Sequence, residues 1–365
     1  MGTVFVSGCY DLLHAGHIDF WRCARELGDE LIVCVADDET IQAAKGRLPA
    51  LPFHHRVYLI ASNQFVDNIA VGTGRIAALN FEPEFRRWRP EILATTEDDK
   101  YENAKRALCE DVGSQYVQLP KTLPFEPISS TDIRRRVNAP SRVPVRVDFA
   151  GGWLDVPRLA REDGYIVNCA VTPCVSLTDW QYEQCGGLGG SGAWAVLNGH
   201  NGVDAELDMG VGWQDPAIVR EGGLCVWRSG DRPMLDSKHN TDFLRGRMAI
   251  YWTGTQHDTP GMVDKPRPYG KIAYASQLAR LAAQKQSLQM VADAIATSYS
   301  AQLEEAMAPL PLYDGALACK YLGGGHGGYA LYLFGTQAER DRFVGEWENT
   351  TAIEPWEQWA DGDDV

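Results

Sequence analysis

The chain has 365 residues, of which 45% are hydrophobic and 23% charged, so it can form about two domains with real cores. It carries 34 Lys and Arg against 49 Asp and Glu, a net charge of −15, and such an acidic chain is repelled by a phosphate backbone, so we expect no nucleic-acid partner. No apolar run has bilayer length, no signal-peptide pattern opens the chain, and the nine cysteines form no zinc spacing, so we expect no membrane partner and a cytoplasmic protein with reduced thiols.

The first third of the chain alternates strand and helix patterns. We predict strands at residues 3–8, 31–37, 91–96 and 115–119, and helices at residues 17–29, 54–64, 102–113 and 128–137. Strands that alternate with helices favour a parallel sheet with right-handed crossovers, and ligands of such sheets bind at the carboxyl ends of the strands. We therefore expect a Rossmann-like α/β domain over residues 1–138.

The pattern changes near residue 138, where NAPSRVP contains two prolines among small residues and predicts a linker. Beyond it we predict strands at residues 142–152, 223–227 and 248–254, an amphipathic core helix over residues 272–307, and two apolar runs hinged on glycines at residues 320–334. This order is typical of an α+β domain, which we place at residues 142–365.

Two histidines follow the first predicted strand and open the next helix. His14 and His17 are three residues apart around Gly16. A helix N-terminus favours an anion through its free N–H groups and dipole, two imidazoles add donors for charge that develops on a phosphate, and glycine lets the backbone approach a ligand. The alternative is a pair of surface histidines, and the position directly after the first strand favours the phosphate site.

Residues 8–39, GCYDLLHAGHIDFWRCARELGDELIVCVADDE, closely resemble the opening of the cytidylyltransferase-like nucleotidyltransferases. The resemblance covers residues 3–137 and implies that His14 and His17 stabilise the transition state at the α-phosphate of a nucleoside triphosphate. It implies further catalytic and nucleotide-binding residues: Lys45 and Arg56 at the triphosphate, Ser129, Ser130, Thr131 and Arg134 in the second nucleotide-binding motif, and Gly8, Tyr10, Asp11 and Gly16 around the first.

Two segments depart from that family's pattern. Lys121, followed by LPFEP, stands where the family has an arginine, and Thr96-Glu97-Asp98-Asp99 replaces the usual Gly-Asp-Asp or Gly-Gly-Asp before the base pocket. The nucleotidyl donor, CTP or ATP, and the acceptor therefore stay open. The implied reaction is attack of a substrate phosphate on the α-phosphate, with loss of pyrophosphate and with Mg²⁺ as cofactor.

Three glycine clusters mark the second half, at residues 151–152, 186–192 and 323–328. The middle cluster contains GLGGSG, a formal match to the dinucleotide pattern, but it lies outside a βαβ unit and lacks the Lys-Ser/Thr of a Walker loop. A glycine-rich loop that enters a helix of small residues can still bind phosphates through its N–H groups.

Five ordered segments over residues 142–335 resemble the GHMP kinases, in particular the fucokinase and heptose-kinase branch: RVPVRVDFAGGWLD, GGLGGSGAW, GVGWQDPAIV, RMAIYWTG and ACKYLGGGHGGYALYLF. The resemblance implies that Arg146 and Asp215 flank the accepting sugar hydroxyl, which Asp215 orients or deprotonates. It implies ATP-phosphate contacts at Gly187, Gly189, Gly190, Ser191 and Gly192, with Ser191 also at Mg²⁺, and sugar contacts at Asp155, Gly324 and Gly325. Three residues stay open as the family's metal-binding acid: Asp204, Glu206 and Asp208.

Together the two halves predict a bifunctional enzyme. The C-terminal domain phosphorylates a sugar at its anomeric hydroxyl with ATP, and the N-terminal domain converts the sugar 1-phosphate to an NDP-sugar. Short segments around the phosphate loop keep an alternative open, a single-activity nucleotidylyltransferase whose second domain only binds sugar or holds a dimer. A non-enzymatic nucleotide sensor is disfavoured by the complete HxGH and ISSTxIR motifs. The expected partners are an NTP and a small-molecule sugar or sugar phosphate, and the first family's frequent dimers imply a homodimer.

Overall fold

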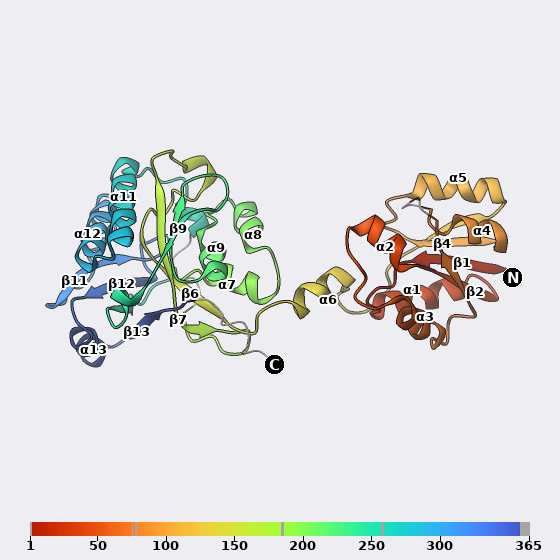
Figure 1. The fold of residues 1–365 in the computed structure, drawn as a ribbon, viewed down its shortest axis with the longest axis horizontal. Helices are drawn as coiled ribbons and strands as arrows, with labels where there is room; N and C mark the ends of the chain where they lie inside the picture. The colour runs from red at the N-terminus through yellow and green to blue at the C-terminus, as the bar shows by residue number, and fades with distance from the viewer. Residues whose placement is uncertain (1, 75, 77–78, 184–185, 257–258, 358–365) are drawn as a thin grey trace. The chain divides into compact units, whose positions relative to one another are not determined.

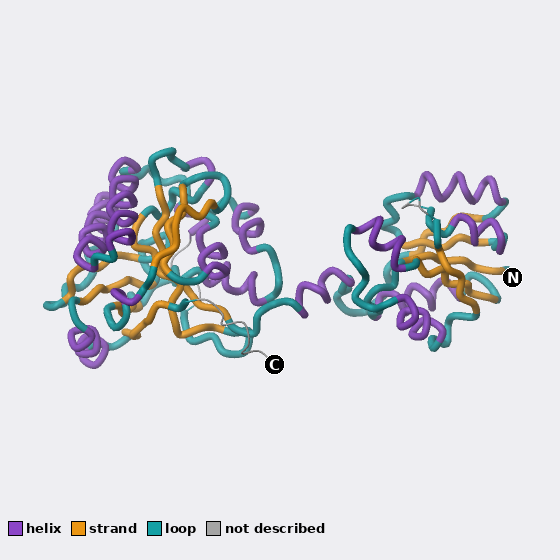
Figure 2. The backbone as a smooth tube through the Cα atoms, in the orientation of Figure 1, coloured by secondary structure: helices purple, strands orange, loops and turns teal. Residues whose placement is uncertain are grey.

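The computed structural model describes residues 2–74, 76, 79–183, 186–256 and 259–357. The chain forms two compact units, Met1–Arg134 and Arg135–Val365, which Figures 1 and 2 draw as a ribbon and a tube. The boundary lies within helix α6 (Ser130–Val137), shortly before the linker predicted from the sequence. Each unit has its own sheet and its own hydrophobic core.

The first unit is built on a five-stranded sheet with the strand order β3-β2-β1-β4-β5, in which every neighbouring pair is parallel. Its strands are β1 (Thr3–Gly8), β2 (Glu30–Ala36), β3 (Asn68–Gly72), β4 (Ile92–Thr96) and β5 (Gln115–Leu119). Its helices before α6 are α1 (Ala15–Arg25), α2 (Asp38–Lys45), α3 (Phe53–Ala61), α4 (Glu82–Trp88) and α5 (Glu102–Val112). The predicted parallel α/β class is therefore confirmed, and the short edge strand β3 and helices α2 and α4 are additions to it.

Alternate residues of β1 face the two layers of helices. Val4 and Val6 belong to a core cluster that includes Trp21 of α1 and Ile60 of α3. Phe5, between them, packs on the opposite side with residues of α4 and α5. Figure 1 shows the same arrangement, with α1 and α3 along one side of the sheet and α4 and α5 along the other. Burial on both faces explains why the strands are almost continuously apolar.

The strand order reverses beside β1. The chain runs from β1 outward through β2 to β3 and then returns to the other side of β1 with β4. The carboxyl ends of β1 and β4 therefore face a topological switch point, the place where open α/β sheets bind ligands. The loop with the two histidines follows β1 directly.

The second unit has an eight-stranded antiparallel sheet with the path β11-β12-β10-β13-β7-β8-β9, and β6 also pairs with β7. Its strands are β6 (Val143–Ala150), β7 (Tyr165–Val175), β8 (Leu224–Arg228), β9 (Met234–His239), β10 (Met248–Trp252), β11 (Ala316–Tyr321), β12 (Tyr329–Phe334) and β13 (Thr350–Pro355). Its α-helices are α7 (Gly190–Leu197), α8 (Gly202–Asp208), α9 (Gln214–Glu221), α10 (Thr259–Met262), α11 (Tyr269–Lys285), α12 (Leu288–Glu304) and α13 (Gln337–Glu346). Two 3₁₀ turns complete it, η1 (Pro157–Leu159) and η2 (Asp242–Leu244). The predicted α+β class is confirmed.

The single amphipathic helix predicted over residues 272–307 is wrong, because the segment forms the two helices α11 and α12. Gln286 ends α11 in a left-handed conformation with φ of +50°. Ser287 then caps α12, since its hydroxyl oxygen accepts the Met290 N–H at 3.4 Å. Figure 1 shows the two helices side by side, with α7, α8 and α9 on the other side of the strands.

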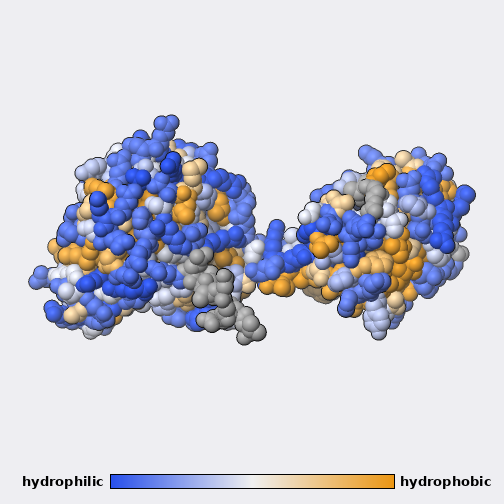
Figure 3. All heavy atoms as spheres, in the orientation of Figure 1, coloured by the Kyte–Doolittle hydropathy of each residue, from blue (hydrophilic) through white to orange (hydrophobic). Residues whose placement is uncertain are grey.

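No helix in the described ranges is long and apolar enough to span a bilayer. In the view of Figure 3, hydrophilic residues cover most of both units, and apolar residues form scattered groups.

The contact between α7 and α9 requires a glycine. A Cβ atom at Gly192 would lie 2.6 Å from the backbone nitrogen of Pro216. We expect Gly192→Ala to lower the free energy of unfolding of the second unit by about 2 kcal/mol through overpacking. The control is Gly270→Ala in α11, where a Cβ meets nothing within 4 Å and we expect no loss. Urea unfolding of the full chain measures both variants, and equal stability of the two would contradict this packing constraint.

Candidate functional site

The predicted histidine pair frames the N-terminus of α1. His14 is the N-cap residue, and its carbonyl oxygen accepts the His17 N–H at 2.9 Å. The His17 Nδ1 accepts the His14 N–H at 3.4 Å, and the two ring centroids lie 3.9 Å apart. Since Nδ1 is an acceptor, neutral His17 carries its proton on Nε2, where it can donate to a phosphate oxygen. Within the described residues the buried His14 Nδ1 has no hydrogen-bond partner, which suits contact with a ligand.

Both imidazoles are neutral at pH 7. Burial, reinforced by the neighbouring His14 ring and by the positive charge of Lys45, lowers the pKa of His17 to about 3. Burial also lowers the pKa of His14, against a smaller opposing effect of a nearby carboxylate. Neutral rings act as hydrogen-bond donors to developing charge, while the neighbouring Lys45, the last residue of α2, supplies a positive charge.

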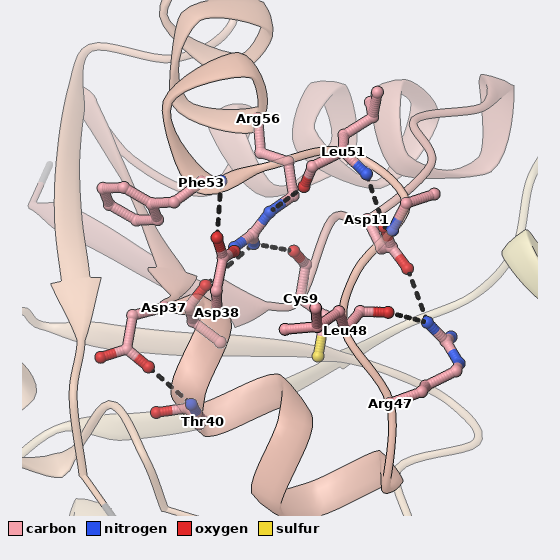
Figure 4. Close-up of polar contacts among 12 residues, drawn as sticks. Cys9, Asp11, Asp37, Asp38, Thr40, Arg47, Leu48, Leu51, Phe53 and Arg56 are labelled. Atoms are coloured by element: carbon pink, nitrogen blue, oxygen red, sulfur yellow. Dashed lines mark hydrogen bonds and ion pairs between the residues drawn. The ribbon is translucent and has the colours of Figure 1, made fainter.

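Asp11 connects the loop after β1 to the segment with Arg47 and Leu51 (Figure 4) and also to Arg134. Its side chain is 2% exposed. One carboxylate oxygen accepts the backbone N–H groups of Ala50 at 2.5 Å and Leu51 at 3.2 Å. The other accepts Arg47 Nη1 at 3.1 Å and a guanidinium nitrogen of Arg134 in α6. Asp11 therefore holds two basic side chains at the loop that precedes the histidines, and its predicted contact with nucleotide stays a prediction.

Arg56 lies in the interior of the first unit, where its guanidinium forms hydrogen bonds with separate segments of the chain (Figure 4). Its side chain is fully buried. Its Nε donates to the Leu51 carbonyl at 3.1 Å, its Nη1 to the carbonyls of Cys9 at 2.5 Å and Ala36 at 2.8 Å, and its Nη2 to Asp38 at 2.6 Å. The resemblance placed Arg56 at the triphosphate. In this structure protein oxygens accept its hydrogen bonds, and its contact with a triphosphate stays a prediction.

Helix α6 brings the second predicted motif to the same site. The Ser130 hydroxyl donates to the Leu12 carbonyl at 3.0 Å, and Arg134 pairs with Asp11. The loop after β1 therefore contacts the motif at two points. The remaining predicted residues of the motif lie before or in the first turn of α6: Ser129, whose hydroxyl accepts the Asp132 N–H, and exposed Thr131.

Tyr10 and two glycines support the histidines. Tyr10 is 4% exposed, and its ring meets the His17 ring edge-on at 5.4 Å. A Cβ at Gly8 would lie 2.8 Å from the Tyr10 ring, and a Cβ at Gly16 would lie 3.1 Å from His14 Nδ1. These glycines therefore leave room for the tyrosine ring and for the His14 ring, and Tyr10 packs against His17.

The two segments that depart from the family pattern contact each other. Lys121 Nζ lies 2.8 Å from a carboxylate oxygen of Asp98, and the Lys121 N–H donates to Glu97 at 3.3 Å. Lys121 is thus engaged with the loop after β4.

In the second unit, Arg146 connects the predicted motifs. Its Nε donates to Asp215 at 2.6 Å, and its Nη1 donates to Asp148 at 3.0 Å and to the Gly187 carbonyl at 2.9 Å. The carboxylate of Asp148 also pairs with Lys320. Although burial opposes it, the charges of Lys320 and Arg146 hold the pKa of Asp148 below its ordinary value. The structure thus joins the predicted Arg146 and Asp215, and adds Asp148 and Lys320, which the motif analysis missed.

The glycine-rich loop lies against this pair. Gly187 and Gly189 have φ of +83° and +75°, and Gly189 caps α7. A Cβ at Gly189 would lie 3.0 Å from Arg146 Cγ and 3.2 Å from Asp215 Cβ, so only glycine allows this approach. The loop is continued by the first turn of α7, which contains the other predicted phosphate contacts: Gly190, Ser191 and Gly192.

Of the three acids that the sequence left open, Glu206 is the one that contacts a predicted phosphate-loop residue. The Ser191 hydroxyl donates to its carboxylate at 2.6 Å. Burial first, and then the negative charge of Asp215, raises the pKa of Glu206 to about 7. Asp204 pairs with a surface arginine, and Asp208 is exposed. A hydroxyl and a buried carboxylate offer the oxygen ligands that Mg²⁺ takes, so these two residues fit the expected metal.

Asp155 is deeply buried, 2% exposed, beside the start of α9. It accepts the Gln214 N–H at 3.1 Å, and a Cβ at Gly212 would overlap its carboxylate. Burial, together with the charge of Asp215, raises the pKa of Asp155 to about 6. Its contact fixes the residue next to Asp215, while its role toward a sugar stays a prediction.

Gly324 and Gly325 lie in the turn between β11 and β12 and are buried. Gly325 has φ of +72°, and a Cβ there would overlap Met307. The preceding Gly323 donates its N–H to Asp148, which attaches this turn to the charged cluster. Contact of the two predicted glycines with sugar also stays a prediction.

Comparison with known proteins identifies the family of the first unit. The cytidylyltransferase-like family model matches residues 5–136. The FAD synthase of Pyrococcus horikoshii is 37% identical over 109 residues, 30% of this chain and 68% of that protein. The FAD synthase of Thermococcus kodakarensis is 31% identical over 137 residues, 37% of this chain and 90% of that protein. An ethanolamine-phosphate cytidylyltransferase of Arabidopsis thaliana is 32% identical over 143 residues, 37% of this chain and 32% of that protein. The resemblance predicted for the first unit is confirmed.

Solved structures that are similar to a larger share of the chain include kinases. Mevalonate kinase of L. major, in complex with R-mevalonate, is 15% identical, covers 59% of this chain and 94% of its own, and gives a TM-score of 0.42. A D-glycero-D-manno-heptose 1-phosphate kinase from Bacteroides thetaiotaomicron is 15% identical, covers 60% of this chain and 96% of its own, and gives a TM-score of 0.41.

The lowered pKa of His17 predicts a pH dependence of stability. Between pH 7 and pH 5 the unfolded chain takes up a proton at residue 17, with pKa 6.5, while the folded chain, with pKa about 3, does not. The free energy of unfolding therefore falls as the pH falls, by about 2 kcal/mol more in the wild type than in His17→Asn. Urea unfolding at pH 7 and pH 5 measures this difference. An equal loss in both proteins would show that His17 is not held neutral.

Proposed function

The chain belongs through residues 5–136 to the cytidylyltransferase-like family, and on that premise we propose that it is a bifunctional enzyme that makes a nucleotide sugar. The second unit transfers the γ-phosphoryl group of ATP to the anomeric hydroxyl of a sugar. The first unit transfers a nucleotidyl group from CTP or ATP to the sugar 1-phosphate. The observation that carries the proposal is that one chain holds both constellations, the His14–His17 pair and the Arg146–Asp215 pair beside a glycine loop.

In the first unit, a phosphate oxygen of the sugar 1-phosphate attacks the α-phosphorus of the NTP. The bond from the α-phosphorus to the bridging oxygen breaks, and pyrophosphate leaves with the electron pair. His17 Nε2–H and the His14 ring donate to the α-phosphate oxygens as negative charge grows there. Lys45, Arg47 and Arg134 neutralise the triphosphate and the leaving pyrophosphate.

In the second unit, Asp215 accepts the proton of the sugar hydroxyl while its oxygen attacks the γ-phosphorus, and ADP leaves. Arg146 holds Asp215 at 2.6 Å and keeps its carboxylate pointed into the site. The glycine loop binds the ATP phosphates through its N–H groups. Ser191 and Glu206 would hold Mg²⁺, which neutralises phosphate charge when bound.

The cysteines bear on the compartment in which the enzyme works. The eight described cysteines are all free thiols. A reducing compartment keeps thiols in that state, and we infer that the enzyme works in the cytoplasm.

The first-unit reaction tests the histidine pair. We expect His14→Ala and His17→Ala each to lower pyrophosphate release at least about 100-fold, because each removes a donor to the developing charge. The assay supplies a panel of hexose and heptose 1-phosphates with each of the four NTPs, and mass spectrometry identifies the NDP-sugar. His55→Ala, an exposed histidine of α3, is the control and should retain wild-type rates. Unchanged pyrophosphate release in both site variants would refute the proposed first activity.

The second-unit reaction tests Asp215. Asp215→Asn should lower ADP formation from ATP and free sugar at least about 100-fold, because the amide accepts no proton. The same variant should keep its pyrophosphate release from a supplied sugar 1-phosphate. The matched control is Asp208→Asn, because Asp208 is an exposed aspartate of α8. Wild-type ADP formation in Asp215→Asn would contradict the kinase assignment.

A further inference from the structure

Four charged side chains of alternating sign form a row in the core of the second unit. Lys320 pairs with Asp148, Asp148 accepts Arg146 Nη1 at 3.0 Å, and Arg146 Nε donates to Asp215 at 2.6 Å. Lys320 comes from β11, Arg146 and Asp148 from β6, and Asp215 from α9. Arg146 and Asp148 are two positions apart on a strand, so their side chains leave the same face. The row therefore crosses the fold from the third glycine cluster to the proposed reacting group.

The exposure of the four groups differs in one respect. The side chains of Lys320, Asp148 and Arg146 are 3–4% exposed, whereas Asp215 is 18% exposed. Water can therefore solvate Asp215 but not Asp148. When the two carboxylates compete for one guanidinium, the buried carboxylate has more to gain.

Lys320 removes that competition. Besides its pairing with the Asp148 carboxylate, its Nζ donates to the Asp148 carbonyl at 3.2 Å. With this cation in place, Asp148 needs only one nitrogen of Arg146, and the Nε edge of the guanidinium stays free for Asp215. The carbonyl of Gly187 accepts Arg146 Nη1 at 2.9 Å, so the same arginine also fixes the glycine loop.

We propose that Lys320 and Asp148 are positioning residues for phosphoryl transfer: Lys320 neutralises Asp148 so that Arg146 is directed to Asp215 and to the glycine loop. This inference rests on the proposed kinase function. It assigns a role to two residues that touch neither the proposed nucleotide nor the sugar. It also makes a charge-balance prediction that a simple packing role does not make.

Four variants of the full chain test the proposal. Lys320→Met leaves Asp148 with one cation, so Arg146 turns toward it and kcat for ADP formation falls about 100-fold, with KM for ATP within about threefold. Lys320→Arg keeps the charge and should retain kcat within about fivefold. Asp148→Asn removes the competitor and should cost only about tenfold. The double variant Lys320→Met/Asp148→Asn restores neutrality and should regain at least about tenfold over Lys320→Met.

A packing role for Lys320 predicts the opposite pattern. In that case the two single losses multiply in the double variant, and such a result would overturn the proposal. Recovery in the double variant supports it, since that variant lacks the lysine but balances the charge. Lys320→Arg and the double variant bury no unpaired carboxylate, so they keep the test valid if Lys320→Met unfolds.

Crystal structures of Lys320→Arg, the double variant and Lys320→Met test the positioning role without an activity assay. We expect the bond from Arg146 Nε to Asp215 to persist in the first two and to be lost in the third. If Lys320→Met does not fold, Asp148→Asn takes its place, and there the bond should persist. An intact bond in Lys320→Met, or a broken one in Asp148→Asn, would overturn the positioning role. A wild-type chain that phosphorylates no sugar would instead refute the proposed function, and the structures would still decide the geometry.

Discussion

A buried carboxylate needs nearby positive charge, because removal of one partner from a buried ion pair costs about 3–5 kcal/mol. Each unit of this chain places such a carboxylate beside its candidate phosphate site. Asp11 is 2% exposed and lies between Arg47 and Arg134. Asp148 is 3% exposed and lies between Arg146 and Lys320. In both units the buried carboxylate must be neutralised, and this requirement fixes the positions of the two basic side chains that pair with it.

This constraint has a consequence for chemistry. Side chains that are held by the protein need little reorganisation when charge develops on a substrate, and fixed donors then stabilise that charge more strongly than water does. In the first unit the two arginines pair with Asp11, on the loop that leads to two imidazoles at a helix N-terminus. In the second unit the fixed arginine connects the proposed base, Asp215, to a loop in which only glycine fits. The proposed consecutive reactions, phosphorylation and nucleotidyl transfer, use these two sites in turn.

The sequence predicted the fold of each unit well because the signals were local. Apolar strands alternate with helices in the first unit, and His14 and His17 stand where a helix begins. The sequence failed where the answer depends on tertiary contacts. Arg56 matches a motif position, but its hydrogen bonds to the carbonyls of three separate segments could not be predicted from the sequence. Helices α11 and α12 were predicted as one helix because the amphipathic pattern continues from one into the other. The single left-handed residue Gln286 separates them.

The charged residues that organise the sites were also hidden from motif analysis. Arg47 is separated from Lys45 by one glycine, and its positive charge was the only sign in the sequence that it belongs to the site. Asp148 lies two residues after Arg146, but nothing in the sequence indicates that Lys320, some 170 residues later, reaches it. Glu206 was one of three nearby acids, and only the contact with Ser191 distinguishes it. Long-range ion pairs of this kind follow from the packing of strands and helices, which local patterns do not determine.

The central claim, that both units bind the phosphates of nucleotides at the described residues, is tested most directly by a crystal structure of the full chain with a non-hydrolysable NTP and Mg²⁺. The account predicts one nucleotide with its α-phosphate within hydrogen-bond distance of His14 and His17, and a second with its phosphates along the loop that contains Gly189 and Ser191. A nucleotide bound away from both the imidazoles and this loop would contradict the account.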